Sequence, residues 1–183
     1  DTEGNFLPAD GESQGELVLR APWLSEGYFN EPQKGAELWA GGWMHTGDVA
    51  TLDAFGVIDI RDRIKDVIKT GGEWISSLAL EDLVSRHPAV REVAVVGIAD
   101  PQWGERPFAL LVVHDGHMIG ARELKEHLKP FVELGHLSKW AIPSQIAVVT
   151  EIPKTSVGKL DKKRIRIDII EWQANNSTFL STL

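Results

Sequence analysis

The sequence predicts an α+β protein in two parts, a small β-rich piece at residues 1–62 and a compact α+β domain at residues 63–183. Three observations predict this division. Up to residue 60 the regular patterns are short, strand-like apolar runs. After residue 66, such runs alternate with helical patterns over about one domain's length. Between the two, residues 61–65 (RDRIK) are densely charged, as is typical of an exposed hinge.

In the N-terminal piece, a polar lead precedes residues 16–20 (ELVLR), which predict a short strand. Residues 21–43 contain repeated prolines and glycines, a composition that argues against any regular helix. Residues 49–52 and 57–60 predict two further strands, joined by a turn at residues 53–56 (DAFG). Three short strands are too few to close a barrel or a sandwich alone.

In the C-terminal part, Gly71-Gly72 predicts a tight turn between strands at residues 66–70 and 73–75. Ser76 or Ser77 can cap a helix that reaches about residue 86, where His87-Pro88 ends it. Further strands are predicted at residues 93–98, 108–113 and 146–150, and further helices at residues 121–134 and 162–171. Pro130 is expected to kink or break the first of these helices, and residues 175–183 are expected to be loose. The predicted order is β-β-α-β-β-α-β-α.

Composition excludes several classes of function. A hydrophobic content of 43% suits a packed core, and the net charge of −8 argues against a nucleic-acid binder. The absence of cysteine excludes disulfides, thiolate nucleophiles and cysteine-based metal sites. No apolar run approaches the roughly 20 residues that span a bilayer, and no basic-then-apolar signal segment opens the chain. A cytoplasmic protein without a membrane span is therefore expected.

Residues 152–160 (IPKTSVGKL) predict an exposed loop that presents Lys159. Gly158 allows the backbone an unusual conformation or a close approach to a ligand. The lysine ammonium suits a carboxylate or a phosphoryl oxygen at which negative charge builds up. The alternative is a solvated surface lysine, which is the commoner situation. The glycine spacing does not fit a phosphate-cradling loop.

Four other charged residues are candidates, each with an ordinary alternative. Asp48 is expected in a loop, where its carboxylate could accept both hydroxyls of a ribose or simply cap its own turn. Arg63 and Lys65 lie in a run of alternating charges, which is usually a solvated face. Lys69 lies beside the double-glycine turn and fits a surface hairpin equally well. The six histidines show no metal-ligand spacing, so no metal site is predicted.

Taken in order, these stretches resemble the acyl-CoA synthetases of the adenylate-forming enzymes. The resemblance covers residues 15–166, most of the chain, and five motifs follow the family's order. They are residues 15–17 (GEL) with Gly27-Tyr28, residues 43–48 (WMHTGD), residues 62–69 (DRIKDVIK) with Gly71-Gly72, Glu81 with residues 87–90 (HPAV), and residues 152–160.

The resemblance implies a ligase with a two-step reaction that uses ATP, Mg²⁺ and CoA. A carboxylate attacks the α-phosphate of Mg-ATP to give an acyl-adenylate and pyrophosphate, and the CoA thiolate then displaces AMP. Residues 71–77 (GGEWISS) resemble medium- and long-chain fatty acyl members, whereas several other members carry arginine in place of Trp74. The implied acid is therefore a medium- or long-chain fatty acid.

The resemblance also implies roles for individual residues. Asp48 and Arg63 would hold the ribose hydroxyls of the nucleotide. Lys65 would be the pivot about which the mobile C-terminal domain rotates between the two steps. Lys159 would be the catalytic residue that touches the acid and the α-phosphate. A hairpin containing Lys69, Gly71 and Gly72 would line the pantetheine tunnel in the second step.

The family's phosphate loop, adenine pocket and acyl tunnel lie in a large N-terminal domain. This chain resembles the end of that domain's β-subdomain followed by the mobile C-terminal domain. The missing N-terminal domain is then the expected partner, the chain alone is expected to be inactive, and exposed β-subdomain surface could drive self-association. Two alternatives are an adenylation domain that delivers acyl groups to a carrier protein and a non-catalytic binding or assembly module. The four intact charges Asp48, Arg63, Lys65 and Lys159 argue against a decayed module.

Overall fold

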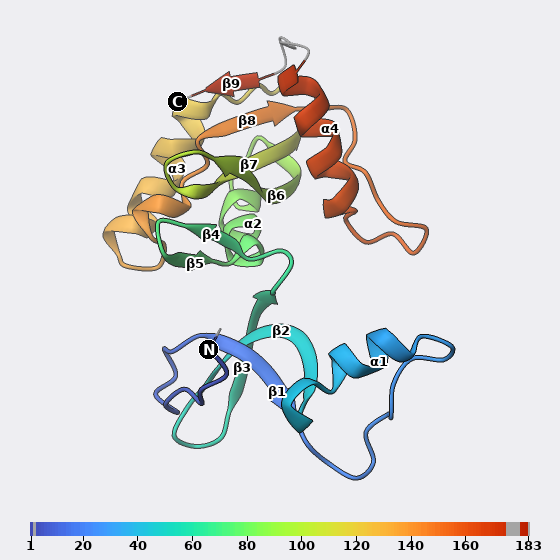
Figure 1. Cartoon of the computed structure of the whole chain (residues 1–183). Coiled ribbons are helices and arrows are strands. Elements are labelled where there is room, and N and C mark those ends of the chain that lie inside the picture. The colour runs from blue at the N-terminus through green and yellow to red at the C-terminus, as the bar shows by residue number, and fades with distance from the viewer. Residues whose placement is uncertain (2, 175–179, 183) are drawn as a thin grey trace. The chain divides into compact units, whose positions relative to one another are not determined.

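The computed structural model describes residues 1, 3–174 and 180–182, and it describes side chains only up to residue 174. The chain divides into an N-terminal unit, Asp1–Lys65, and a C-terminal unit, Asp66–Leu183. Both units combine helices with mainly antiparallel sheet (Figure 1), which confirms the predicted α+β class.

The N-terminal unit is built on one antiparallel three-stranded sheet. Its strands are β1 (Gly15–Leu19), β2 (Met44–Leu52) and β3 (Ile58–Arg63), in the order β1-β2-β3. The predicted turn joins β2 to β3, and it is closed by the Asp53 carboxylate, which accepts backbone N–H groups from Phe55 and Val57 at 2.9 Å. Val49 and Ala50 of the central strand are the buried apolar side chains of the described part of this unit.

Two expectations for this unit are wrong. A short helix, α1 (Pro32–Leu38), and a 3-10 turn, η1 (Ala40–Gly42), form in the segment for which no regular helix was expected. Proline is tolerated in the first turn of a helix, where its missing N–H would have no partner, so Pro32 begins α1 instead of preventing it. In addition, β2 begins at Met44, because β1 pairs with Met44 and His45. Asp48 therefore lies on a strand and not in a loop.

The C-terminal unit contains a six-stranded sheet in the order β5-β4-β7-β8-β9, with β6 paired to β7. The β7–β8 pair is parallel and the other pairs are antiparallel. The tail at residues 175–183 was expected to be loose, and this is wrong for residues 180–182, which form the last strand. The other residues of the tail, 175–179 and 183, lie outside the described residues. The strands are β4 (Ile68–Thr70), β5 (Glu73–Ile75), β6 (Val90–Asp100), β7 (Gly104–Val113), β8 (Gln145–Val148) and β9 (Leu180–Thr182).

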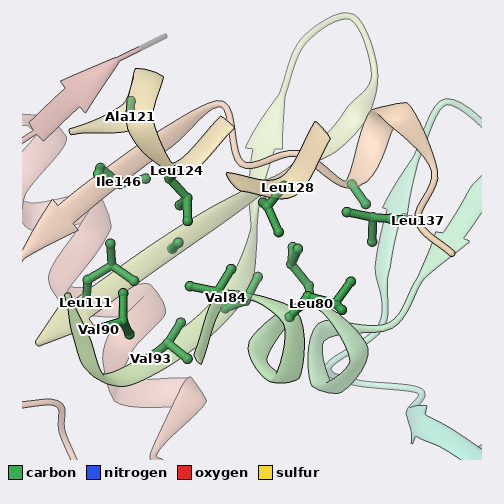
Figure 2. Close-up of a cluster of buried hydrophobic side chains, with 14 of the residues drawn as sticks. Leu80, Val84, Val90, Val93, Leu111, Ala121, Leu124, Leu128, Leu137 and Ile146 are labelled. Atoms are coloured by element: carbon green, nitrogen blue, oxygen red, sulfur yellow. The ribbon is translucent and has the colours of Figure 1, made fainter. Parts of the chain in front are cut away.

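Helices cover both faces of this sheet. Because side chains alternate along a strand, Val93 and Val95 of β6 join one hydrophobic cluster while Ala94 and Val96 join another. The first cluster is filled by the helices α2 and α3 (Figure 2), and the second by α4. The helices are α2 (Ser77–Ser85), α3 (Ala121–Glu133) and α4 (Lys162–Ala174), with a 3-10 turn η2 (Lys139–Ala141) before β8.

Local signals fix the helix ends. Ser76 caps α2, since its hydroxyl accepts the N–H of Ala79 at 3.1 Å. Pro130, expected to kink or break α3, lies inside the helix, which continues to Glu133. It lies in the last turn, where Leu134 N–H still donates to the Pro130 carbonyl at 3.0 Å, so the missing proline N–H removes one hydrogen bond and leaves the rest of the turn intact.

Candidate functional site

The β2–β3 ladder brings Asp48 and Arg63 together. The two residues are direct partners in its register, and Arg63 Nε lies 2.8 Å from Asp48 Oδ1. The Asp48 side chain is 22% exposed and that of Arg63 is 59% exposed, so the pair lies at the surface of its unit with the carboxylate more buried. A carboxylate has further lone pairs beyond the one that Arg63 uses, which allows this pair to accept ligand hydroxyls.

The peptide before Asp48 is held by side chains. The Thr46 hydroxyl accepts the N–H of Asp48 at 3.1 Å, and Glu16 Oε1 accepts the N–H of Gly47 at 3.2 Å. Gly47 has φ +71°, a conformation that suits glycine and that other residues adopt only under strain. The backbone at Asp48 is therefore set by more than the strand ladder.

Glu16 also contacts His45, the residue before Thr46. The Nδ1 atom of His45 lies 2.7 Å from Glu16 Oε2, and Nε2 lies 3.1 Å from the carbonyl oxygen of Ala40. The hydrogen bond to Glu16 is the main cause that raises the pKa of His45 above its ordinary value, and it outweighs the opposing effect of partial burial. Glu16 and His45 stand inside two of the motifs described above, yet sequence reasoning predicted no role for either, because the contact joins residues on two strands.

Lys159 lies on a well-anchored loop between β8 and α4. Thr155 and Lys159 are joined by two hydrogen bonds: the Thr155 N–H donates to the Lys159 carbonyl at 2.7 Å, and the Lys159 N–H donates to the side-chain hydroxyl of Thr155 at 3.2 Å. Gly158, with φ +80°, makes the turn, and Lys154 at its base pairs with Glu92 of β6 at 2.8 Å. The side chain of Lys159 is exposed and makes no ion pair within the described part of the chain. The loop thus presents an unengaged ammonium on a fixed backbone.

Lys69, Gly71 and Gly72 form the predicted hairpin between β4 and β5. Both glycines have positive φ, 57° and 86°, which matches a two-residue turn of the type favoured in hairpins. Lys69 is exposed, and its Nζ atom lies 5.3 Å from the centroid of the Trp74 ring. The loop that bears Lys159 and this hairpin lie on different sides of the C-terminal unit (Figure 1), so the fold does not bring them together.

A carboxylate from β7 supports the hairpin. Glu105 Oε2 accepts the backbone N–H of Lys69 at 2.8 Å. A Cβ atom on Gly97 of β6 would lie 2.8 Å from that same oxygen, so glycine at this position makes the space that Glu105 occupies. Sequence reasoning missed Glu105, since its partner is 36 residues away.

Lys65 is exposed and is the last residue of the N-terminal unit. The next residue, Asp66, binds Arg166 of α4 at 3.1 Å and so ties the start of the C-terminal unit to that unit's last helix.

Three residues after Lys159, Lys162 has the opposite environment. Its Nζ atom lies 2.8 Å from Glu81 Oε1 and 2.6 Å from the Ser77 hydroxyl, and the Lys162 and Glu81 side chains are only 10% and 11% exposed. Glu81 Oε1 also accepts the N–H of Val95 on β6 at 2.8 Å. This buried cluster ties α4 to α2 and covers part of the β6 edge, which is a structural role.

Among the described residues, no group of three or more His, Asp or Glu side chains could hold a metal ion. The helices of the described ranges lack the length and apolarity that a bilayer crossing requires.

Comparison with known proteins shows which proteins this chain is similar to. Residues 79–159 match the model of the AMP-binding enzyme C-terminal domain. The chain is 44% identical over 167 residues to a long-chain-fatty-acid–CoA ligase of Thermus thermophilus, and 42% identical over 166 residues to a 3-methylmercaptopropionyl-CoA ligase of Ruegeria lacuscaerulensis. Each alignment covers 91% of this chain and 30% of the relative, so the chain spans about 30% of the length of these relatives.

A solved structure gives the same result for the fold. The amide bond synthetase McbA of Marinactinospora thermotolerans aligns with a TM-score of 0.77 and 34% identity, over 92% of this chain and 33% of its own. Sequence, family model and fold agree: the chain belongs to the adenylate-forming enzymes and contains their AMP-binding enzyme C-terminal domain.

Proposed function

We propose that this chain is the C-terminal part of an ATP-dependent acid:CoA ligase that activates a medium- or long-chain fatty acid. The observation that carries the proposal is the Asp48–Arg63 pair, in which a partly buried carboxylate and an exposed guanidinium lie side by side on neighbouring strands. Such a pair fits the two vicinal hydroxyls of a ribose, since the carboxylate accepts both O–H groups and the guanidinium donates to a hydroxyl oxygen.

In the first step, an oxygen of the substrate carboxylate attacks the α-phosphorus of ATP, and pyrophosphate leaves. The role of Lys159 is to bring its ammonium to the acid and the α-phosphate, where it offsets the negative charge that collects in the transition state. Its exposed side chain and anchored backbone support that role. Mg²⁺ would arrive as part of Mg-ATP, because the described residues offer no acidic cluster to hold it.

In the second step, the CoA sulfur attacks the carbonyl carbon of the acyl-adenylate, and AMP leaves. The hairpin with Lys69, Gly71 and Gly72 would line the approach of the pantetheine arm, where glycines leave room beside the backbone. The loop that bears Lys159 and this hairpin lie on different sides of the C-terminal unit, so one site would not use both at once. A rotation at Lys65, where the two units meet along the chain, would exchange them.

The acid and the acceptor are the finer parts of the proposal. The GGEWISS stretch at residues 71–77 supports a fatty acid, as does the name of the Thermus relative, while the Ruegeria relative is named for 3-methylmercaptopropionate. CoA is the proposed acceptor because both of these relatives are CoA ligases. McbA is named an amide bond synthetase, so an amine is the acceptor to test beside CoA and a carrier protein.

An N-terminal domain of the same enzyme is the proposed partner. The N-terminal unit exposes large aromatic side chains, including those of Trp23, Tyr28 and Phe29, which such a partner would cover. Without it, the same surface would favour self-association of the chain.

The test is acid-dependent exchange of pyrophosphate into ATP by the full-length gene product, with acids of increasing chain length. We expect exchange with medium or long fatty acids, thioester formation when CoA is added, and no turnover by the 183-residue chain alone. Pyrophosphate exchange without formation of the CoA thioester would favour a carrier protein or an amine as the acceptor. The absence of exchange with every carboxylic acid would leave a binding module as the better account.

A further inference from the structure

Both ring nitrogens of His45 face hydrogen-bond acceptors. Nδ1 lies 2.7 Å from a carboxylate oxygen of Glu16, and Nε2 lies 3.1 Å from the carbonyl oxygen of Ala40 in η1. A neutral imidazole carries one N–H and can satisfy only one of the two acceptors. The imidazolium carries two N–H groups and satisfies both, so the geometry selects the charged form of His45.

The carboxylate of Glu16 has a second contact. While Oε2 faces His45, Oε1 accepts the N–H of Gly47 at 3.2 Å. The carbonyl of Gly47 accepts the N–H of Ile64 at 2.9 Å, so this glycine is held from β1 on one side and from the end of β3 on the other. Since Gly47 immediately precedes Asp48, Glu16 fixes the direction in which the chain enters the Asp48–Arg63 pair.

The surroundings of the ring contain few other charges. Within the described residues, Glu16 is the charged group that contacts His45 from β1, and η1 contributes a backbone carbonyl only. Thr46, the next residue on β2, adds a neutral link: its hydroxyl donates to the Leu17 carbonyl at 2.7 Å and accepts the N–H of Asp48. The charge of His45 therefore depends chiefly on one carboxylate.

We propose that Glu16 is a positioning residue for Asp48 and that it acts as the anionic half of a charge pair with doubly protonated His45. The inference rests on the proposed function in one respect, namely that Asp48 meets the nucleotide. The hydrogen bonds of Glu16 hold the peptide before Asp48 in its binding direction before the nucleotide arrives, so little ordering remains for the ligand to impose.

Glu16→Gln separates the charge from the hydrogen bonds. The glutamine oxygen can still accept the N–H of Gly47, while its NH₂ group donates to Nδ1 of His45, which then becomes a neutral Nε2–H tautomer. Glu16→Ala removes both contacts. Glu31→Gln is the matched control, because it makes the same change of charge in an exposed pair with Lys34.

The experiment is ¹⁵N–¹H spectroscopy of the histidine rings and amides of the chain. In the wild-type protein, His45 should hold both ring protons and titrate above the ordinary histidine value of about 6.5. In Glu16→Gln its titration should move to lower pH, with exchange of the Gly47 and Asp48 amides nearly unchanged. In Glu16→Ala that exchange should accelerate about tenfold, the effect of losing roughly one hydrogen bond. Glu31→Gln should change neither.

Kinetics of the full-length protein then test the link to the nucleotide. Glu16→Ala should raise the KM for ATP in the exchange reaction more than it lowers kcat. Glu16→Gln should raise the KM for ATP much less than Glu16→Ala does. A singly protonated His45 in the wild-type chain would overturn the charge pair, and unchanged amide exchange in Glu16→Ala would overturn the positioning role. If the wild-type protein shows no exchange reaction, the proposed function fails while the ring and amide results still decide the network.

Discussion

The two units of this chain stabilise their sheets in different ways. The sheet of the C-terminal unit is covered on both faces, by one cluster that includes Leu80 and Leu124 and by another that includes Phe108 and Ile165. In the N-terminal unit, the buried apolar side chains among the described residues are Val49 and Ala50, whereas Phe55 is 93% exposed. Hydrogen bonds and ion pairs around β1 and β2 take the place that apolar packing has in the other unit.

This difference decides which candidate site residues also contribute to the stability of a sheet. In the C-terminal unit, Lys159 and Lys69 are exposed and belong to neither hydrophobic cluster, so either side chain can change without disturbing the core. In the N-terminal unit, Asp48 and Arg63 are part of the ladder itself. We therefore expect activity and stability to separate in the C-terminal unit and to change together in the N-terminal unit.

Lys159→Ala tests whether activity and stability separate in the C-terminal unit. We expect ATP–pyrophosphate exchange by the full-length protein to fall about 10²- to 10³-fold, the usual cost of one transition-state donor. The midpoint of thermal unfolding should stay the same, since the ammonium pairs with none of the described residues. Lys163→Ala, an exposed lysine on α4, is the control for charge. A lower midpoint in Lys159→Ala would break the separation of activity from stability.

Lys162→Ala should have the reverse effect in the same unit. Removing the buried ammonium from beside Glu81 should cost about 3 kcal/mol of unfolding free energy, a typical value for breaking a buried ion pair from one side. Urea unfolding of the chain, followed by NMR signals from β6 and β7, measures this cost. The double variant Lys162→Met with Glu81→Gln should recover part of it. A loss below 0.5 kcal/mol, within the range of exposed pairs (about 0–1 kcal/mol), would mean that the cluster is solvated.

Amide exchange compares the two sheets directly. Strands that lack apolar cover open at lower free energy, so we expect β2 amides to exchange at least about a hundredfold faster than β7 amides. Equal protection would contradict the comparison unless the chain self-associates and covers the N-terminal sheet. Sedimentation at several concentrations separates these cases, because a concentration-independent monomer argues against self-association.

The smallest expected effect is an opposite response to pH. Burial, followed by the nearby His127, lowers the pKa of His87, although Glu123 opposes this. The stability contributed by neutral His87 is therefore present above the unfolded value of about 6.5 and is lost as the pH falls towards the folded pKa. For His45 the pKa is raised, so its contribution is present below about 6.5 and is lost as the pH rises through the folded pKa.

Each of these two contributions changes by at most about 1.4 kcal/mol per pH unit, the limit for one proton. Urea unfolding between pH 5 and pH 9, with NMR signals assigned to each unit, should show the N-terminal unit weakening on the alkaline side and the C-terminal unit on the acidic side. His45→Gln should remove the alkaline loss and leave the acidic loss unchanged. The same slope for both units would contradict the assignment of the two histidines.

Much of the fold could be predicted because its signals are local. The β-branched run around Val95, the Ser76 cap and the Gly71-Gly72 turn each indicate an element without reference to distant residues. Elements that depend on distant partners were missed or misplaced. β9 depends on pairing with β8, and the start of β2 on pairing with β1.

The candidate site divides in the same way. Asp48, Arg63 and Lys159 could be chosen because their motifs occur in a recognisable order. Glu16, which lies 31 residues from Gly47, and Glu105, which lies 36 residues from Lys69, could not, since they act through contacts that only strand pairing creates.

Residue type and spacing along the chain predict the order of the strands and helices from β4 to α4, the Ser76 cap, the Gly71-Gly72 turn and the family to which the chain belongs. The tertiary structure alone decided which charges are presented and which are buried. Lys159 and Lys162 stand three residues apart in one basic stretch, yet the first is exposed on a loop and the second is buried against Ser77 and Glu81 of α2. The reason is physical: the burial of a charge depends on the partners that surround it, and for Lys162 those partners come from residues 77 and 81, far away in the sequence.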